Sequence, residues 1–114
     1  MPDESTTIAS LKQAVARFVA ERNWQPYHSP KNLAMALTCE TAELVELFQW
    51  VDSEQSRQLA RDPAMREAIG DELADVFNAL LCLCMSMDFD LSDELLRKMQ
   101  KNAQKYPVPS PGPG

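Results

Sequence analysis

Glycine is scarce in this chain of 114 residues, which contains three, two of them among the last three positions. The alternation of apolar and polar residues that marks half-buried strands is also absent, and apolar residues recur instead at helical spacing. This length suits one domain with one core and is too short for two. The sequence therefore predicts an all-α fold in a single domain.

Positive charge is in the minority, with 11 lysines and arginines against 17 acidic residues and a formal net charge of -6. An acidic surface repels nucleic-acid backbones and anionic membranes, so neither is expected as a partner, and an anionic ligand needs a bridging cation. The most apolar run, residues 76–87, is shorter than the roughly 20 residues of a membrane crossing. The N-terminus has no basic and apolar leader typical of secretion. We therefore expect a soluble, cytoplasmic protein.

Cysteine is also sparse, and the three residues present form no CxxC pair. Cys39, Cys82 and Cys84 are an odd number in apolar surroundings with no histidine nearby in the sequence. This pattern favours reduced thiols in the cytoplasm over a disulfide framework or a zinc site. All three are expected to behave as small buried hydrophobic residues.

Four principal helices are predicted. Serine followed by proline at position 30, and aspartate followed by proline at position 63, are cap and first-turn pairs that mark two helix starts. A segment rich in proline and glycine, residues 107–114, is expected to be disordered beyond a domain of residues 1–106. The expected helices cover about Ile8–Arg22, Pro30–Val51, Pro63–Met87 and Asp90 or Ser92 to Lys105, with a short helical turn at Ser53–Ala60.

Two of these helices carry carboxylates inside their apolar stripes. At 100° per residue, Leu33, Leu37 and Leu44 all lie within roughly 60° of Glu40, and Glu43 lies at the edge of the stripe. On the third helix, Glu72 and Asp75 repeat the arrangement, with Met65, Ala68, Val76, Ala79 and Leu83 within roughly 40° of Glu72. Each helix thus points two acids toward the space where the helices pack.

An ionised carboxylate in an apolar interior must become protonated, pair with a cation or coordinate a metal. Lysines and arginines do not occupy matching core positions on these helices, which leaves the metal as the favoured solution. All-oxygen ligands suit Mg²⁺ or Mn²⁺, whereas a di-iron bundle would want ExxH partners, and the single histidine is in a loop. The alternative is that the helix phases are wrong and the four acids are solvated surface residues.

The two doublets, ExxE at Glu40 and Glu43 and ExxD at Glu72 and Asp75, resemble those of the MazG-type all-α nucleoside triphosphate pyrophosphohydrolases. The stretch ERNWQPYHSPKNLAMALTCETAELVELFQW is similar to the dCTP pyrophosphatase branch, and the likeness returns at DELADV and KMQKNAQKYP. The resemblance implies a four-helix MazG-like bundle subunit, hydrolysis between the α and β phosphates, Mg²⁺ held by the four acids, and a homotetramer.

By the same resemblance, Trp24, His28 and Trp50 belong to the nucleobase pocket, and Lys98 and Asn102 approach the nucleotide from the last helix. The residues alone also permit structural roles that involve no nucleotide. Tryptophan at a helix end is more often a core or interface residue, a loop histidine is commonly just hydrogen-bonded, and surface lysines are usually solvated.

Two departures from the family pattern leave the preferred base open. An aromatic residue expected one turn after the second acidic pair is Ala79 here, and a pocket histidine expected in the first helix is Val15. The favoured function is Mg²⁺-dependent cleavage of dCTP or a modified dCTP. The alternatives are the same chemistry on dUTP or another non-standard nucleotide, and a helical oligomerisation or regulatory module without catalysis.

Two further hypotheses concern the reaction and the assembly. Glu43, or Glu46 one turn later, is the candidate general base, because the edge of the stripe is open to solvent. Residues 76–87 are apolar on nearly every face of the third helix, which predicts that a second subunit covers part of it.

Overall fold

The computed structural model describes residues 1–109, and every regular element within them is helical, which confirms the all-α prediction. The last five residues of the predicted disordered segment lie outside the described part. The elements are η1 (Asp3–Ser5), α1 (Ile8–Glu21), η2 (Gln25–Tyr27), α2 (Pro30–Glu46), α3 (Ser53–Gln58), η3 (Leu59–Arg61), α4 (Pro63–Ser86) and α5 (Leu91–Lys105).

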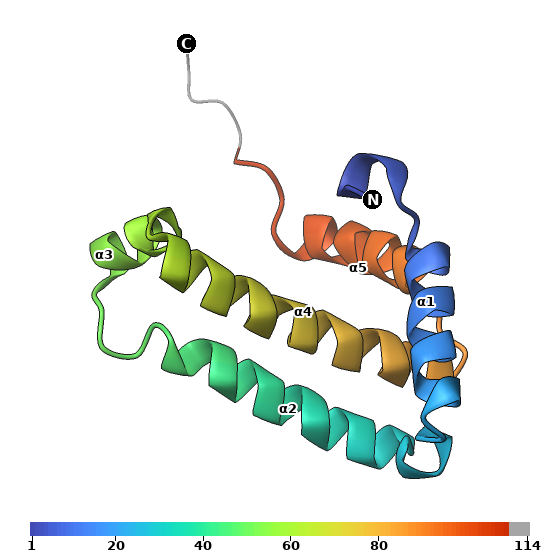
Figure 1. Cartoon of the computed structure of the whole chain (residues 1–114). Coiled ribbons are helices and arrows are strands. Elements are labelled where there is room, and N and C mark those ends of the chain that lie inside the picture. The colour runs from blue at the N-terminus through green and yellow to red at the C-terminus, as the bar shows by residue number, and fades with distance from the viewer. Residues whose placement is uncertain (110–114) are drawn as a thin grey trace.

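The main unit of the fold is the antiparallel pair formed by α2 and α4, whose long axes lie side by side in Figure 1. Helix α1 crosses the C-terminal half of α4, and α3 with η3 closes the opposite end of the pair. The core cluster is formed by Val19, Leu33 and Cys82, with Val15, Leu83 and Met85 packed against it. The fold is therefore organised around one face of α4.

Both predicted cap pairs are confirmed. The hydroxyl of Ser29 accepts a hydrogen bond from the backbone N–H of Asn32 at 3.1 Å, and the carboxylate of Asp62 accepts one from Met65 at 3.1 Å. Each satisfies an N–H that the first helical turn leaves unpaired, while the following proline has no N–H to satisfy. These caps fix where α2 and α4 begin, and hence how far along each helix its acidic doublet lies.

Helix α2 is shorter than predicted, because it ends at Glu46 and not at Val51. From Leu47 onward the backbone tightens into turns with bonds to the third preceding residue, such as Phe48 N–H to Val45 O at 2.9 Å. Asp52 and Gln55 then form a reciprocal capping box that starts α3. Trp50, which the predicted helix would have included, instead lies in the turn after α2 and is 88% exposed.

Cysteine burial follows the prediction at two positions of three. Cys82 and Cys84 are buried on α4, and burial raises the pKa of the Cys82 thiol above its usual value. Cys39 is exposed on α2, so the prediction of burial is wrong for this residue. Its neighbour Glu40 takes the inward-facing position, and one residue along a helix turns the side chain by roughly 100°.

The subunit is open for its size. Its surface area is 9194 Å², whereas a compact chain of this mass exposes roughly 6,300 Å². Its radius of gyration is 17.9 Å, against about 13 Å for a compact domain of this length. Helix α5 contributes no buried residue, and its side chains Leu95, Leu96 and Met99 are each more than half exposed. Much apolar surface is thus left uncovered.

Candidate functional site

The four predicted carboxylates meet between α2 and α4. Glu40, Glu43, Glu72 and Asp75 each offer one oxygen, and these four oxygens all lie within 4.8 Å of one another. The four acids therefore converge as the predicted helix phases require, although two of them are also exposed to solvent. Each helix contributes one partly buried glutamate and one exposed acid, because residues three apart differ by roughly 60° around a helix axis.

The inner acids lack compensation within the subunit. One carboxylate oxygen of Glu40 and one of Glu72 are buried without a hydrogen-bond partner. No lysine or arginine forms an ion pair with any of the four acids in residues 1–109. Buried oxygens without partners are costly in an ordinary fold, and an all-oxygen set of four carboxylates matches what a hard divalent cation requires. The residues present therefore fit a metal ion.

The electrostatics point the same way. Burial raises the pKa of the Glu40 carboxyl, and the neighbouring charges of Glu43 and Asp75 raise it further. Burial likewise raises the pKa of Glu72, again followed by the charges of Glu43 and Asp75. Both shifts disfavour the ionised form, which a bound cation would favour instead.

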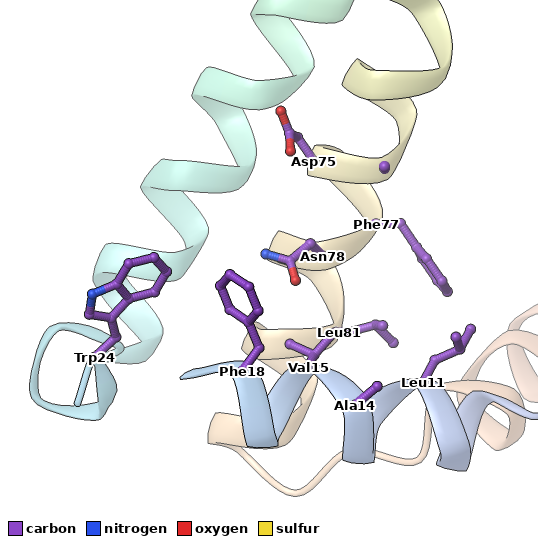
Figure 2. A pocket seen from close by; sticks show the side chains of 10 residues that line it. Leu11, Ala14, Val15, Phe18, Trp24, Asp75, Phe77, Asn78 and Leu81 are labelled. Atoms are coloured by element: carbon purple, nitrogen blue, oxygen red, sulfur yellow. The ribbon is translucent and has the colours of Figure 1, made fainter. Parts of the chain in front are cut away.

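An apolar cleft adjoins this cluster. Its volume is about 600 Å³, and its lining comes from α1, the connector after α1, and α4. Asp75 belongs to both the cleft and the four-carboxylate cluster, and Figure 2 shows it at one end of the cleft with Phe18 and Trp24 toward the other. The remaining lining residues are Leu11, Ala14, Val15, Ala74, Phe77, Asn78 and Leu81.

Trp24 is positioned by the way α1 ends. Asn23 adopts the left-handed conformation (φ 55°). The backbone N–H of Trp24 then donates a hydrogen bond to the backbone C=O of Val19 at 3.1 Å, the pattern of a Schellman motif. This turn brings the Trp24 ring edge-on to Phe18, with 5.7 Å between ring centroids and an interplanar angle of 65°. The guanidinium of Arg22 lies 3.4 Å from the Phe18 centroid. The aromatic wall is therefore braced within the subunit.

The other predicted site residues lie elsewhere in the subunit. His28 lines a separate concavity with Gln25, Cys82 and Ser86, and Trp50 is exposed in the turn after α2. Lys98 and Asn102 are exposed on α5 and line neither cleft. Glu46 is exposed at the end of α2, outside the four-carboxylate cluster.

Sequence reasoning missed several residues of the cleft, of which Phe18 and Asn78 matter most. Phe18, on the first helix, is 48% exposed and lines the cleft. Asn78 lies within the apolar run of residues 76–87. Its spacing of three residues from Asp75, which places both on one helix face, was the available signal.

The fold and the site define an all-helical protein in which an antiparallel helix pair presents four convergent carboxylates beside an aromatic cleft. The model of the MazG-like family matches residues 35–111, and the chain belongs to this family. Among its relatives, the proteins named dCTP pyrophosphatase 1 from Bos taurus and Homo sapiens are 39% and 38% identical over 102 residues, or 90% of this chain. The chain spans 60% of the length of these relatives.

A solved structure supports the same assignment of the fold. The crystal structure of a pyrophosphatase from Archaeoglobus fulgidus superposes with a TM-score of 0.81 at 35% identity. The match covers 95% of this chain and 99% of that one. No helix among residues 1–109 has the length and apolar character needed to cross a membrane.

The crowded acids predict an unusual dependence of stability on pH. Glu40 and Glu72 have native pKa values raised above 4.5, so above about pH 5 the native state holds protons that the unfolded chain has released. The free energy of unfolding of the metal-free protein should therefore fall as the pH rises from the unfolded-state pKa of these two glutamates toward their native-state pKa. Excess Mg²⁺ should raise the melting temperature, more at pH 7.5 than at pH 5, because the ligands must be deprotonated.

Thermal melts in EDTA and in Mg²⁺ at several pH values measure both effects. Glu72→Gln is the matched control, since it removes one titrating carboxyl while keeping its shape. This variant should show a shallower fall in EDTA and a reduced response to Mg²⁺. A melting temperature that rises with pH in EDTA and does not change when Mg²⁺ is added would contradict this account of the cluster.

Proposed function

We propose that this protein is a Mg²⁺-dependent nucleoside triphosphate pyrophosphohydrolase that converts dCTP, or a modified dCTP, to dCMP and pyrophosphate. The observation that carries the proposal is the pair of buried, unpartnered carboxylate oxygens in a four-acid cluster that shares Asp75 with an aromatic cleft. The family, and the names of the relatives and of the similar structure, support the chemistry and the choice of nucleotide.

The site offers two environments that match the two ends of a nucleotide. Glu40, Glu43, Glu72 and Asp75 would hold Mg²⁺, or Mn²⁺ as a substitute, and so give a triphosphate a place beside an acidic protein. When bound, such a cation offsets charge on the phosphate oxygens and orients the reacting groups. Phe18 and Trp24 give the base an apolar wall at the other end of the cleft. One molecule can therefore occupy both environments.

A panel of deoxynucleoside triphosphates, with and without Mg²⁺, tests this function by the release of pyrophosphate. We expect release only with the cation and a preference for dCTP over the purine nucleotides. Glu72→Gln should lower kcat/KM by about a hundredfold or more, because even groups that merely support a metal ligand contribute 10- to 100-fold. Absence of release from every nucleotide would favour a regulatory helical module instead.

The reaction adds one water across the α–β phosphoanhydride, and the proton of that water needs an acceptor. Glu43 and Glu46 remain the candidates: both are exposed, Glu43 within the four-acid cluster and Glu46 three residues further along α2. Removing a general base typically costs 10²- to 10⁴-fold in rate. Glu43→Gln and Glu46→Gln, compared at saturating Mg²⁺, should differ, with kcat lowered about a hundredfold or more in the variant that has lost the base.

A Mg²⁺ titration of each variant separates loss of the base from loss of a ligand. A variant that only binds the cation more weakly recovers its rate at high Mg²⁺, whereas a variant that lacks the base does not. If both variants kept near-normal kcat at saturating Mg²⁺, neither residue would be the base.

The same enzyme is proposed to be a homotetramer. On α5, Asn102 lies within roughly 20° of Leu91 and Leu95 and roughly 60° from Met99, and Lys98 lies at the opposite edge of that stripe. Leu95 and Met99 of this stripe are more than half exposed. A partner subunit packed on it would bury the stripe and bring Lys98 and Asn102 into an interface. This arrangement accounts for how residues far from the cleft could reach a nucleotide.

Light scattering coupled to gel filtration should give a mass near four times 12.8 kDa at micromolar concentration. Leu95→Glu places a charge in the stripe and should lower the mass, because an unpaired charge is costly in an apolar interface. Gln100→Glu, the same type of charge on the same helix, is the control and should leave the mass unchanged. A monomer mass for the unaltered protein would contradict the proposal.

A further inference from the structure

Asn78 carries the only side-chain amide in the lining of the aromatic cleft. Apart from Asp75 and the indole N–H of Trp24, every other side chain of the lining is hydrocarbon. Figure 2 shows the Asn78 amide projecting from α4 into the space bounded by Asp75, Phe18 and Trp24. Asn78 is exposed, and its amide makes no hydrogen bond to any other residue within the described chain. Its donor and acceptor are therefore both free to serve a ligand.

The position of Asn78 along α4 suits contact with the part of a nucleotide that lies beyond its phosphates, further from the acid cluster. It follows Asp75 by three residues, so the two side chains are neighbours on one face, with Cβ atoms about 5–6 Å apart. Asp75 belongs to the acid cluster, and the aromatic pair forms the far wall. A nucleotide with its phosphates at the cluster and its base against Phe18 and Trp24 would pass its polar base edge by Asn78.

We propose that Asn78 is the residue that reads the hydrogen-bonding edge of the base, and that it accepts both cytosine and uracil nucleotides. This inference rests on the proposed function and extends it to specificity. An amide has one C=O acceptor and one NH₂ donor side by side. Cytosine presents an amino donor beside a ring-nitrogen acceptor, and uracil presents the reverse order, so one half-turn of the amide matches either edge.

The absence of an intramolecular partner is what makes the selectivity broad. A site rejects the wrong edge strongly when its polar groups are held in one orientation, since those groups then lose their bonds. Within the described chain nothing holds the Asn78 amide in either orientation. Of the lining residues only Asp75 and Trp24 carry another polar group, and neither forms a hydrogen bond with Asn78. The expected result is a pyrimidine site with little preference between amino and oxo forms.

The test compares three substrates: dCTP, dUTP and 2-deoxyribose 5-triphosphate, which has the same phosphates and sugar but no base. For the unaltered protein with Mg²⁺, kcat/KM for dCTP and dUTP should agree within about tenfold. Asn78→Leu and Asn78→Ala both remove the amide, one with its volume kept and one without. In both variants the ratio of kcat/KM for each nucleotide to that for the base-free triphosphate should fall by about tenfold or more, as expected for two lost hydrogen bonds.

Gln13→Leu, an amide-to-leucine change at an exposed position of α1 outside the cleft, is the matched control and should leave these ratios unaltered. A purely structural role for Asn78 predicts equal losses on all three substrates and would overturn the proposal. So would a loss confined to one pyrimidine, or a loss in the leucine variant alone, which indicates a change of shape. Failure of the unaltered protein to cleave any nucleotide overturns the proposed function itself, before any variant is compared.

Discussion

The structure depends on the electrostatic cost of placing four carboxylates within 4.8 Å of one another between two packed helices. A fold made only for stability would fill this space with hydrocarbon side chains. Helix α4 is packed in this way around Leu81, which lies six residues beyond Asp75 and is 2% exposed. Here burial and mutual repulsion raise the pKa of Glu40 and of Glu72, and one oxygen of each has no partner. The helix pair thus holds four crowded acids at the expense of its own stability, an arrangement that fits a bound cation.

The rest of the subunit can tolerate that cost because α4 performs several tasks with different faces. Its N-terminal half carries the acid doublet, its C-terminal half supplies the buried residues Ala79, Leu81, Cys82 and Cys84, and α1 crosses the latter. The crossing places the aromatic wall of α1 and its connector in the same cleft as Asp75 of the acid cluster. A single rigid helix therefore sets the distance between the charged and the apolar ends of the site.

Helix phase was the part of the structure that the sequence predicted well. Glu40 and Glu72 could be placed on the packing face because angles along a regular helix depend only on residue number, and the cap residues Ser29 and Asp62 fixed where each helix starts. Trp50 could not be placed in the same way. Helix α2 tightens into turns after Glu46, and no proline or glycine marks that point, so the helix predicted as far as Val51 ends before Trp50.

The cleft was harder to predict, since it depends on how elements meet and not on the period within one element. Phe18 and Asn78 are brought to the same cleft by the crossing of α1 over α4, and Trp24 by the left-handed turn at Asn23. Asparagine is among the few non-glycine residues that adopt this conformation readily, so the turn had a signal in the sequence. The crossing had none, because it is decided by side-chain packing between segments far apart in the chain.

The charge of the whole chain gives the acid cluster a second consequence. A net charge of -6 repels a triphosphate at long range, so an acidic protein can hold such a ligand only where positive charge is concentrated. Within residues 1–109 no lysine or arginine lines the cleft, and the Arg22 guanidinium is stacked on Phe18, so a cation held by the four acids would supply that positive charge. The same ion that relieves the crowding of Glu40 and Glu72 would therefore also be what admits the ligand, which ties folding stability and ligand binding to one equilibrium.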